Sequence, residues 1–430
     1  MALWSLLRRL LSKNRNGRLG VRCWSRGGEL ILGHTSTGKS VSIPFGGARG
    51  GTHTLLVGAT GSGKTVTQAW LATRGIERGM GAVVIDPKGD RAMREAVADA
   101  ARRAGKQLIV WTAEGPSVYN PFARGTDTEI ADKVLAGERF TEPHYLRQAQ
   151  RFLGHVVRGL RASGGEVSLR AIVSSLDPEA LEVLARGLPE STARPVHAYL
   201  DSLTTRQLSD LAGARDRLAI LAESDLGPWL DPENGRGGRF DLQEAIRARA
   251  VVYFDLDADR RPLLMQMLGA AIVQDLLTTV AELQGDPTPT VVVIDEFSAV
   301  AAENVVRLFG RARSAGLSLV LSTQELTDLR LPGREHLLEQ VLGNLTVLLA
   351  HRQVVPASAE LISSLTGTRG TWRTTQQDRG RSSRTRVREN VLGSSELMQL
   401  PPGWLAAVTL GNATGVQIAQ VFPPREEVQR

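Results

Sequence analysis

Residues 53–65 read HTLLVGATGSGKT, and this stretch decides the fold. Its first half is an apolar run typical of a buried strand, and residues 58–65 satisfy the pattern G-x-x-x-x-G-K-[ST] of a phosphate-binding loop. The residues that follow Thr65 lack proline and place apolar side chains at helical spacing. A helix that begins at Gly63 would direct its free N–H groups and the positive end of its dipole towards a phosphate. The stretch therefore predicts a strand, a phosphate-binding loop and a helix in succession.

A second match to the same pattern, GHTSTGKS, occupies residues 33–40. Pro44 and the glycine-rich stretch after it would interrupt any helix that followed the match. Residues 29–45 instead have the pattern of a β-hairpin. We therefore expect Lys39 and Ser40 to be ordinary strand residues, and a single nucleotide site in the chain.

Composition sets only broad limits. The chain has 430 residues, of which 42% are hydrophobic and 23% charged, values typical of globular proteins with two or three domains. The chain has 52 lysines and arginines and 45 aspartates and glutamates. This basic excess is compatible with binding of nucleic acid or of anionic lipid and does not distinguish between the two. The single cysteine, Cys23, excludes an internal disulfide and a cysteine zinc site and fits a reducing cytoplasm.

The N-terminal residues 1–27 are basic and begin with an amphipathic pattern. Leucines recur at helical spacing over residues 3–11, and basic side chains lie on the other face. Such a helix could lie on a membrane surface, dock on a partner or dock on its own core. No run of apolar residues is long enough to predict a transmembrane helix, and the arginines exclude a signal peptide.

Short apolar runs recur along the rest of the chain, and most are separated by helical patterns such as the one at 261–283. They are nearly continuous in Val, Ile and Leu, as expected of strands covered on both faces. The predicted strands lie at 53–58, 82–87, 107–112, 250–257, 290–297, 317–324 and 345–352. This alternation predicts an α/β fold with a parallel-dominated sheet, preceded by the short N-terminal hairpin.

The strand signal stops between residues 126 and 234, where only helical patterns occur. Because this stretch interrupts the sheet, it predicts an inserted all-α domain. We therefore divide the chain into an N-terminal tail (1–27), a first part of the ATPase domain with the hairpin (28–125), the all-α insert (126–234) and a second part of the ATPase domain (235–430).

The motifs supply most of what hydrolysis of a phosphate anhydride requires. The nucleotide would be held by Gly58, Ala59, Thr60, Gly61, Ser62, Gly63, Lys64 and Thr65. Lys64 would neutralise phosphate charge, while Thr65 and Asp295 would bind magnesium. Asp295 ends the apolar run VVVI, and Glu296 beside it could act as the general base towards the attacking water.

Two further candidates follow in the chain. Gln324 ends the next apolar run, where its amide could contact the γ-phosphate or the water. Arg311 and Arg313 lie between Glu296 and Gln324, and either could supply the positive charge that a neighbouring subunit often contributes to phosphoryl transfer.

Together these motifs resemble the FtsK–HerA group of motor ATPases, and within it the TraD/TraG-type coupling proteins of conjugative and type IV secretion systems. The resemblance rests on LLVGATGSGKT, VVIDPKGD (83–90), VVVIDEF, GRARSAG with the later STQ, and VLGSSELMQLPPGWLAAV (391–408), and covers about residues 28–422. It implies a RecA-like P-loop core with an inserted all-α domain, ATP and Mg2+ as cofactors, and a ring homo-hexamer with ATP between subunits and DNA in the channel.

The resemblance also assigns roles to particular residues. It implies that Asp86 and Lys88 lie near the nucleotide, and it favours Arg313 over Arg311 as the arginine supplied in trans. Such proteins usually begin with transmembrane helices, and none is predicted here. We therefore expect a cytoplasmic chain, either recruited to the inner face of the cell membrane or a soluble relative.

The arginine-rich stretch 368–390 is the predicted mobile DNA-contacting loop, and a disordered charged hairpin is the alternative. Candidate contacts are Arg373, Arg379, Arg381 and Arg384, with Trp372 stacking on a base.

The leading hypothesis is an ATP-driven motor that passes DNA, or a DNA–protein conjugate, to a secretion channel, with relaxosome or channel proteins as partners. The alternatives are an FtsK- or HerA-like DNA translocase, a protein-pumping secretion ATPase, and a nucleotide-dependent docking scaffold. The intact pair Asp295 and Glu296 argues against the scaffold, which has no need of a water-activating acid.

Overall fold

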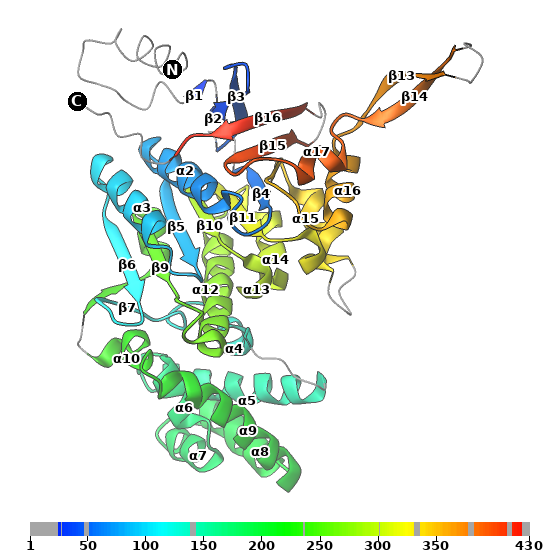
Figure 1. The fold of residues 1–430 in the computed structure, drawn as a ribbon. Coiled ribbons are helices and arrows are strands. Elements are labelled where there is room, and N and C mark those ends of the chain that lie inside the picture. Colours follow the sequence, from blue (N-terminus) through cyan, green and yellow to red (C-terminus); the bar gives the residue numbers. More distant parts are fainter. Residues whose placement is uncertain are drawn as a thin grey trace.

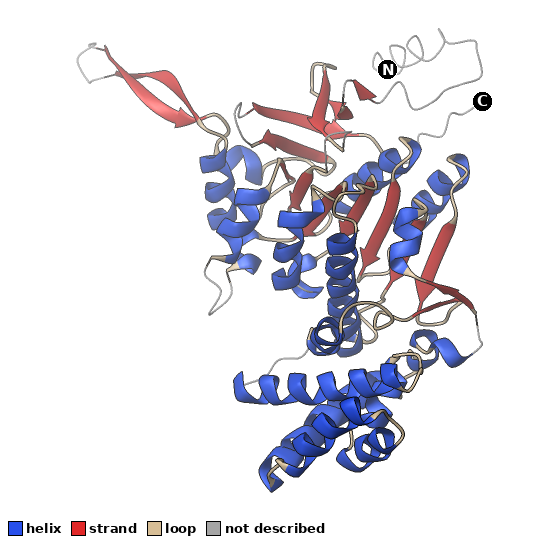
Figure 2. Ribbon diagram, turned by 180° about the vertical axis from the view of Figure 1, so that it is seen from behind, coloured by secondary structure: helices blue, strands red, loops and turns tan. Residues whose placement is uncertain are grey.

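The structure is a computed structural model that describes residues 25–26, 28–46, 51–137, 143–234, 237–300, 302–330, 336–376, 382–410 and 415–423. The predicted N-terminal amphipathic helix, Arg379 and Arg381 lie outside the described residues. A sheet covered by helices on both faces forms the body, a helical bundle lies at one end, and a two-stranded ribbon projects at the other (Figures 1 and 2).

The centre of the sheet is parallel, as the sequence predicts. Its neighbouring strands are β12 (Val347–Ala350), β4 (His53–Val57), β11 (Leu317–Thr323), β10 (Thr290–Ile294), β5 (Gly81–Asp86), β9 (Val251–Asp255) and β6 (Leu108–Thr112). Each adjacent pair runs in the same direction. All the predicted strands are therefore confirmed, and their carboxyl ends share one edge of the sheet.

An antiparallel extension joins the sheet beyond β12. It consists of β15 (Trp404–Thr409), β16 (Gly415–Val421), β2 (Glu29–His34), β3 (Ser40–Pro44) and β1 (Ser25–Arg26). The predicted hairpin is thus confirmed as β2 and β3. Lys39 is a correction, because it lies in the connecting turn, where its N–H donates to Thr35 Oγ1, while Ser40 begins β3.

Two hydrophobic clusters cover the two faces of the sheet, because neighbouring residues in a strand point to opposite sides. On one face, Leu56 and Val84 pack with Trp70 of helix α2 (Lys64–Glu77) and Val97 of helix α3 (Arg91–Arg103). On the other face, the cluster reaches helices α11 (Leu242–Arg247), α12 (Pro262–Glu282), α13 (Phe297–Val300), α14 (Ala302–Ala312), α15 (Leu337–Asn344) and α16 (Pro356–Leu365). The continuous apolar runs of the strands reflect this double coverage.

Helix α12 is unusually long and apolar. Of the described helices it alone has the length and hydropathy that could cross a membrane, and 78% of its most apolar window is buried inside the fold. It packs against α4, α11, α13 and α14. In this structure it is therefore a core helix.

The helical bundle occupies the predicted insert. Its helices are α4 (Asp127–Leu135), α5 (Pro143–Ala162), α6 (Leu169–Ser175), α7 (Pro178–Arg186), α8 (Glu190–Asp201), α9 (Thr205–Ala222) and α10 (Gly227–Leu230), followed by η2 (Pro232–Asn234). A small parallel sheet of β7 (Ser117–Tyr119) and β8 (Gly238–Phe240), which was not predicted, pairs the segments on either side of the bundle. The four predicted segment boundaries stay a prediction.

A buried ion pair ties the bundle to the body. Lys133 of α4 is completely buried, and its Nζ lies 2.5 Å from Asp275 Oδ1 of α12. The same ammonium donates to the carbonyls of Pro121 and Arg124, and Tyr119 donates to Asp275 Oδ2 at 2.6 Å. All three Lys133 donors therefore have acceptors, as a buried charge requires.

The arginine-rich stretch is a ribbon rather than a loop, which corrects the prediction. Strand β13 (Thr368–Gln376) pairs antiparallel with β14 (Ser382–Asn390), between helices α16 and α17 (Ser394–Met398). The ribbon extends away from the body at the end opposite the bundle (Figures 1 and 2).

Candidate nucleotide site

The phosphate-binding loop connects β4 to α2, as predicted. Gly61 and Gly63 have φ of 73° and 111°, which favour glycine. A Cβ on Gly58 would lie 2.6 Å from His351 Cβ, so this glycine permits close packing on the segment after β12. The loop is also held from the other side, where the Gly403 N–H donates to the Ser62 carbonyl. Glycine backbone conformations and contacts from distant segments therefore hold the loop in this shape.

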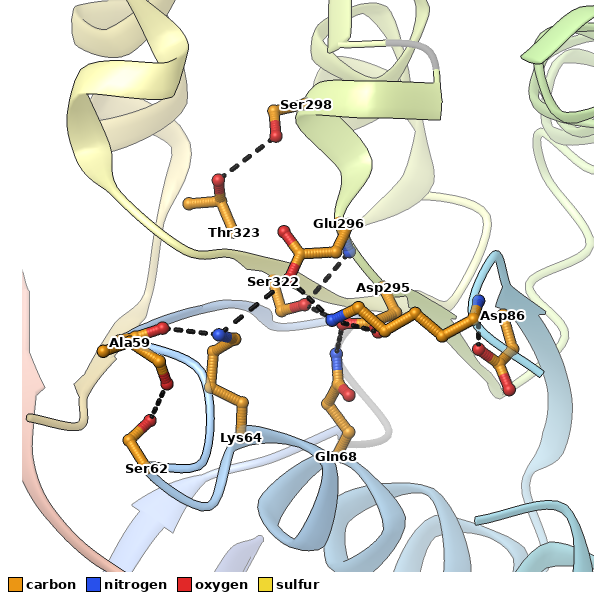
Figure 3. Close-up of polar contacts among 12 residues, drawn as sticks. Ala59, Ser62, Lys64, Gln68, Asp86, Asp295, Glu296, Ser298, Ser322 and Thr323 are labelled. Carbon is orange, nitrogen blue, oxygen red and sulfur yellow. Dashed lines mark hydrogen bonds and ion pairs between the residues drawn. The ribbon is translucent and has the colours of Figure 1, made fainter. Parts of the chain in front are cut away.

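Lys64 begins helix α2 with its side chain buried. Its Nζ donates to the Gly58 carbonyl and lies 3.9 Å from Glu296 Oε1 (Figure 3). Burial lowers the pKa of Lys64, and the charge of Glu296 opposes this effect. The ammonium is thus placed between the loop and the acid pair, where phosphate oxygens would be accommodated.

The predicted acid pair follows β10 directly. Asp295 Oδ1 accepts a hydrogen bond from Gln68 Nε2 at 2.9 Å and another from Ser322 Oγ (Figure 3). Glu296 adopts a φ of 43°, a left-handed conformation that is uncommon for a residue with a side chain. Its N–H donates to Ser322 Oγ at 3.2 Å. Two residues of neighbouring elements therefore hold the acid pair in place, and strain at Glu296 is typical of a functional site.

Lys88 links the two acids to the second strand. Its Nζ lies 2.8 Å from Glu296 Oε1 and 3.3 Å from Asp295 Oδ2. Burial alone would lower the pKa of Lys88, but the charges of Asp295 and Glu296 and their hydrogen bonds outweigh burial and raise it. The ammonium therefore remains charged and compensates the two carboxylates.

Asp86 shapes the turn that presents Lys88. Asp86 Oδ1 accepts from the N–H groups of Lys88 at 2.9 Å and Gly89 at 3.1 Å. Its Oδ2 accepts from the Asp90 N–H at 2.7 Å and the Tyr253 hydroxyl at 2.6 Å. Burial raises the pKa of Asp86, and these hydrogen bonds oppose the rise. Since its oxygens already have partners within the protein, we assign Asp86 to positioning Lys88.

The donor set fits magnesium. The Thr65 hydroxyl and the Asp295 carboxylate are hard oxygen donors, and Mg2+ typically takes one or two protein oxygens together with water and phosphate oxygens. The described residues contain no cluster of three or more His, Cys, Asp or Glu that would form an all-protein cage. The cation Lys88 already lies against Asp295, so this edge of the sheet accommodates positive charge.

Gln324 and Arg313 lie at opposite edges of the sheet. Gln324 follows β11 directly, at the carboxyl edge, and is exposed. Arg313 precedes β11, and its Nη2 donates to Thr346 Oγ1 at 3.4 Å, just before β12. The seven residues of β11 span about 20 Å. Arg313 therefore cannot reach Lys64 of its own chain, and a catalytic role would require a neighbouring subunit.

Three supporting residues were missed by the sequence analysis. Gln68 lies one helical turn after Lys64, and Ser322 lies two residues before Gln324, so helical and strand spacing could have placed both beside Asp295. His351 Nε2 lies 3.0 Å from Thr67 Oγ1, behind the loop, and burial lowers its pKa to about 4. No sequence pattern predicts this last contact, because it joins helix α2 to the residue after β12, which is far away in the chain.

The ribbon carries a second group of candidate residues. Arg384, Arg386 and Arg388 alternate along β14, so they share one face. Trp372 is paired with Arg386 across the ribbon and is 64% exposed. A Cβ on Gly370 would lie 2.9 Å from Arg386 Nε, so this glycine leaves room for the guanidinium.

Only some of these ribbon residues are predicted from the sequence. Arg384 and Trp372 are on the arginine face, whereas Arg373 pairs with Thr385 in the ladder. Arg386 and Arg388 were missed, although their alternation is visible in RTRVR.

Comparisons with known proteins agree with this geometry. A family model described as the central domain of helicase HerA matches residues 30–219, and one described as the TraM recognition site of TraD and TraG matches residues 289–402. The type 4 coupling protein DotL of Legionella pneumophila is 22% identical over 352 residues, which cover 66% of this chain and 45% of DotL. The chain thus spans about half the length of this curated relative.

Solved structures share the fold. The bacterial conjugative coupling protein TrwB, without an N-terminal segment, superposes with a TM-score of 0.69 at 18% identity, covering 94% of this chain and 90% of TrwB. TrwB in complex with ADP and Mg2+ gives 0.65 at 19% identity, over 94% and 91%. VirB4 of Thermoanaerobacter pseudethanolicus gives 0.58 at 17% identity, over 93% and 97%.

The fold and the site define the class of protein. A phosphate-binding loop after β4, an acid pair after β10 and a parallel sheet between helices give this chain the P-loop fold with a RecA-like core. The two family models and DotL are similar in sequence to parts of this chain, and TrwB shares its fold.

Proposed function

We propose that this chain hydrolyses ATP as a ring-shaped motor that passes DNA, or a DNA–protein conjugate, to a conjugative or type IV secretion channel. The observation that carries the proposal is the convergence of Lys64, Glu296 and Lys88 at one edge of the sheet. These residues come from three separate parts of the chain, and they meet beside the phosphate-binding loop. The side chains of Lys64 and Glu296 are nearly buried, and burying charged groups is costly, which favours a catalytic purpose.

Each residue has a distinct part in hydrolysis. The loop N–H groups and Lys64 bind the β- and γ-phosphates and neutralise their charge. Thr65 and Asp295 hold Mg2+, which supplies further neutralisation of phosphate charge. Glu296 accepts the proton of the water that attacks the γ-phosphate, once Lys88 has exchanged its contact with Glu296 for one with phosphate oxygens. Gln324 orients that water or the γ-phosphate from the next strand.

A ring of subunits is supported by the position of Arg313. In its own chain Arg313 lies at the amino edge of the sheet, remote from the loop. A neighbour packed head to tail would bring this edge to the first subunit's nucleotide. The proposal of a homo-hexamer also draws on the likeness of the fold to TrwB.

DNA as the substrate is supported by the ribbon. Arg384, Arg386 and Arg388 form a row of cations that can contact DNA phosphates whatever the base sequence. Trp372 offers an exposed ring on which a base can stack. The relatives DotL and TrwB are described as coupling proteins, which favours transfer through a secretion channel over movement of chromosomal DNA. We further propose that the chain acts at the inner face of the cell membrane, with relaxosome or channel proteins as partners.

The proposal is tested by measuring ATP hydrolysis with and without single- and double-stranded DNA, at low and moderate salt. Wild-type turnover should depend on Lys64, rise with DNA and lose that stimulation as salt increases. Glu296→Gln should lower kcat by roughly 10²–10⁴-fold, because the base is removed, while nucleotide binding is retained. Unchanged turnover in Glu296→Gln would contradict the assigned base.

The alternatives give different results in the same assay. Lys64-dependent turnover that responds to a secreted protein and not to DNA would identify a protein pump. Nucleotide binding without turnover under any condition would identify a docking scaffold.

A further inference from the structure

A basic cavity lies on the helical bundle, away from the nucleotide site. Its volume is about 340 Å³, and it is lined by one face of α5 and by Thr128 of α4. Arg147, Arg151 and Arg158 share that face because they are four and seven residues apart. The bundle and the ribbon lie at opposite ends of the molecule (Figures 1 and 2), so the cavity is separate from the proposed DNA-contacting surface.

The arginines of this cavity are only partly neutralised. Arg158 Nε lies 3.3 Å from Asp127 Oδ2. Among the described residues no carboxylate pairs with Arg147 or Arg151, which are adjacent on the helix and repel one another. Arg151 is nevertheless held in place, with its guanidinium 4.4 Å from the centre of the Tyr199 ring. A bound anion would relieve the repulsion and use a guanidinium that is already oriented.

Two further residues that line the cavity, His155 and Gly154, suit a ligand. His155 Nδ1 is buried without a hydrogen-bond partner in the described structure, and the His155 ring stacks on Tyr199. Burial and the charges of Arg158 and Arg151 lower the pKa of His155, which reflects the positive potential there. Gly154 lies within a 20-residue helix, where glycine is less stable than alanine, yet a Cβ there would meet no atom within 4 Å.

We propose that this cavity binds the carboxylate groups of an acidic segment of a partner protein. Guanidinium groups bind carboxylates through paired hydrogen bonds, and arginine clusters are a common means of recognising acidic motifs. The small, concave shape suits one or two side chains, whereas a nucleic-acid backbone needs an extended row of cations such as the ribbon provides. The cavity would thus recruit a protein without using the nucleotide site.

The test measures binding of a fluorescein-labelled hexaglutamate peptide, with an amidated C-terminus, to the full chain by fluorescence anisotropy without nucleotide. Wild type should bind, and the affinity should fall as salt rises from about 50 to 200 mM. Arg151→Glu should weaken binding at least about tenfold, because one charge-assisted pair is replaced by repulsion. Arg194→Glu makes the same charge change on an exposed arginine of α8 that does not line the cavity, and should retain wild-type affinity.

A second variant separates filling of the cavity from loss of charge. Gly154→Leu should abolish peptide binding while raising or preserving thermal stability, because leucine favours the helix and projects into the cavity. Lys64→Ala should bind the peptide as wild type does even if it is inactive as an ATPase, so failure of the motor proposal and failure of this one are distinguishable.

Three results would overturn the proposal. One is absence of peptide binding at low salt. Another is equal weakening by Arg194→Glu and Arg151→Glu, which would show attraction by overall charge alone. The third is that oligo(dT) displaces the peptide and binds more tightly than the peptide does, and that Arg151→Glu removes this binding of oligo(dT). That result would assign the cavity to nucleic acid.

Discussion

Two groups of charged residues in this protein differ in how they are held. At the nucleotide site, the side chains of Lys64 and Glu296 are 6% and 11% exposed and contact one another or Lys88. On the bundle and the ribbon, Arg147, Arg151 and Arg384 are exposed at the surface. Buried charges must be paired inside the protein, whereas exposed arginines are solvated and remain available for an external anion.

This difference predicts two kinds of response to mutation. Removal of one member of the buried group leaves its partners uncompensated, so effects should be large and insensitive to salt. Removal of one exposed arginine should affect a single interaction, with an effect that is small, additive and reduced by salt. The predictions below test where this division holds, from the largest expected effect to the smallest.

Arg313 should be an exception to this division, because it is exposed and yet is expected to have a large effect on catalysis. Arg313→Ala should lower kcat by about 10³-fold or more, if a neighbouring subunit uses this charge to stabilise the transition state. Mixing Arg313→Ala with Lys64→Ala protein should restore part of the activity, since some interfaces then combine an intact loop with an intact arginine. The measurement compares the ATPase rate of the mixture with the rates of the two variants measured separately. A mixture whose rate equals the sum of the separate rates would contradict a role in trans.

Lys133 sharpens the comparison, because it is a buried charge outside the nucleotide site. Lys133→Met should lower the free energy of unfolding by about 3–5 kcal/mol, because Asp275 is left buried without its cation. Chemical denaturation measures this decrease. The double variant Lys133→Met with Asp275→Leu should be destabilised by less than the sum of the single changes, and full additivity would show that the two residues do not interact.

His53 tests a buried group that the fold keeps neutral. Burial, then the charge of Arg313, lowers its pKa from 6.5 to about 4. A depressed folded pKa means that the contribution to stability is complete above about pH 6.5 and is lost as the pH falls towards 4. The decrease in unfolding free energy at low pH would be about 3 kcal/mol. His53→Gln should therefore have a flatter dependence of unfolding free energy on pH between these values, and an unchanged slope would contradict the assignment.

The ribbon should show the smallest single-residue effects. Trp372→Ala should weaken binding of single-stranded DNA by about 1–3 kcal/mol if the ring stacks on one base. Arg386→Ala should lower the slope of log affinity against log salt by about 0.7 if its guanidinium neutralises one phosphate. Arg369→Ala on the other face of the ribbon is the matched control, and an equal effect there would exclude a binding face defined by register.

Local sequence patterns were sufficient to predict the strands of the parallel sheet and the hairpin, but not the order in which all the strands assemble. Continuous Val, Ile and Leu runs predicted every strand of the parallel sheet, because burial on both faces leaves a clear composition signal. Pro44 and the glycines after it correctly indicated that the second match to the loop pattern is a β-hairpin. The antiparallel extension through β15 and β16 was not predicted, since strand order depends on contacts between distant segments.

The sequence by itself determined the phosphate-binding loop, the acid pair at Asp295 and Glu296, and the all-helical character of residues 127–230, because each depends on residues close together in the chain. Only the tertiary structure decided that Lys88 joins the acid pair and that Arg313 lies at the opposite edge of the sheet. The physical reason is that charged side chains are placed by partners from other strands, and the sequence does not specify those pairings locally.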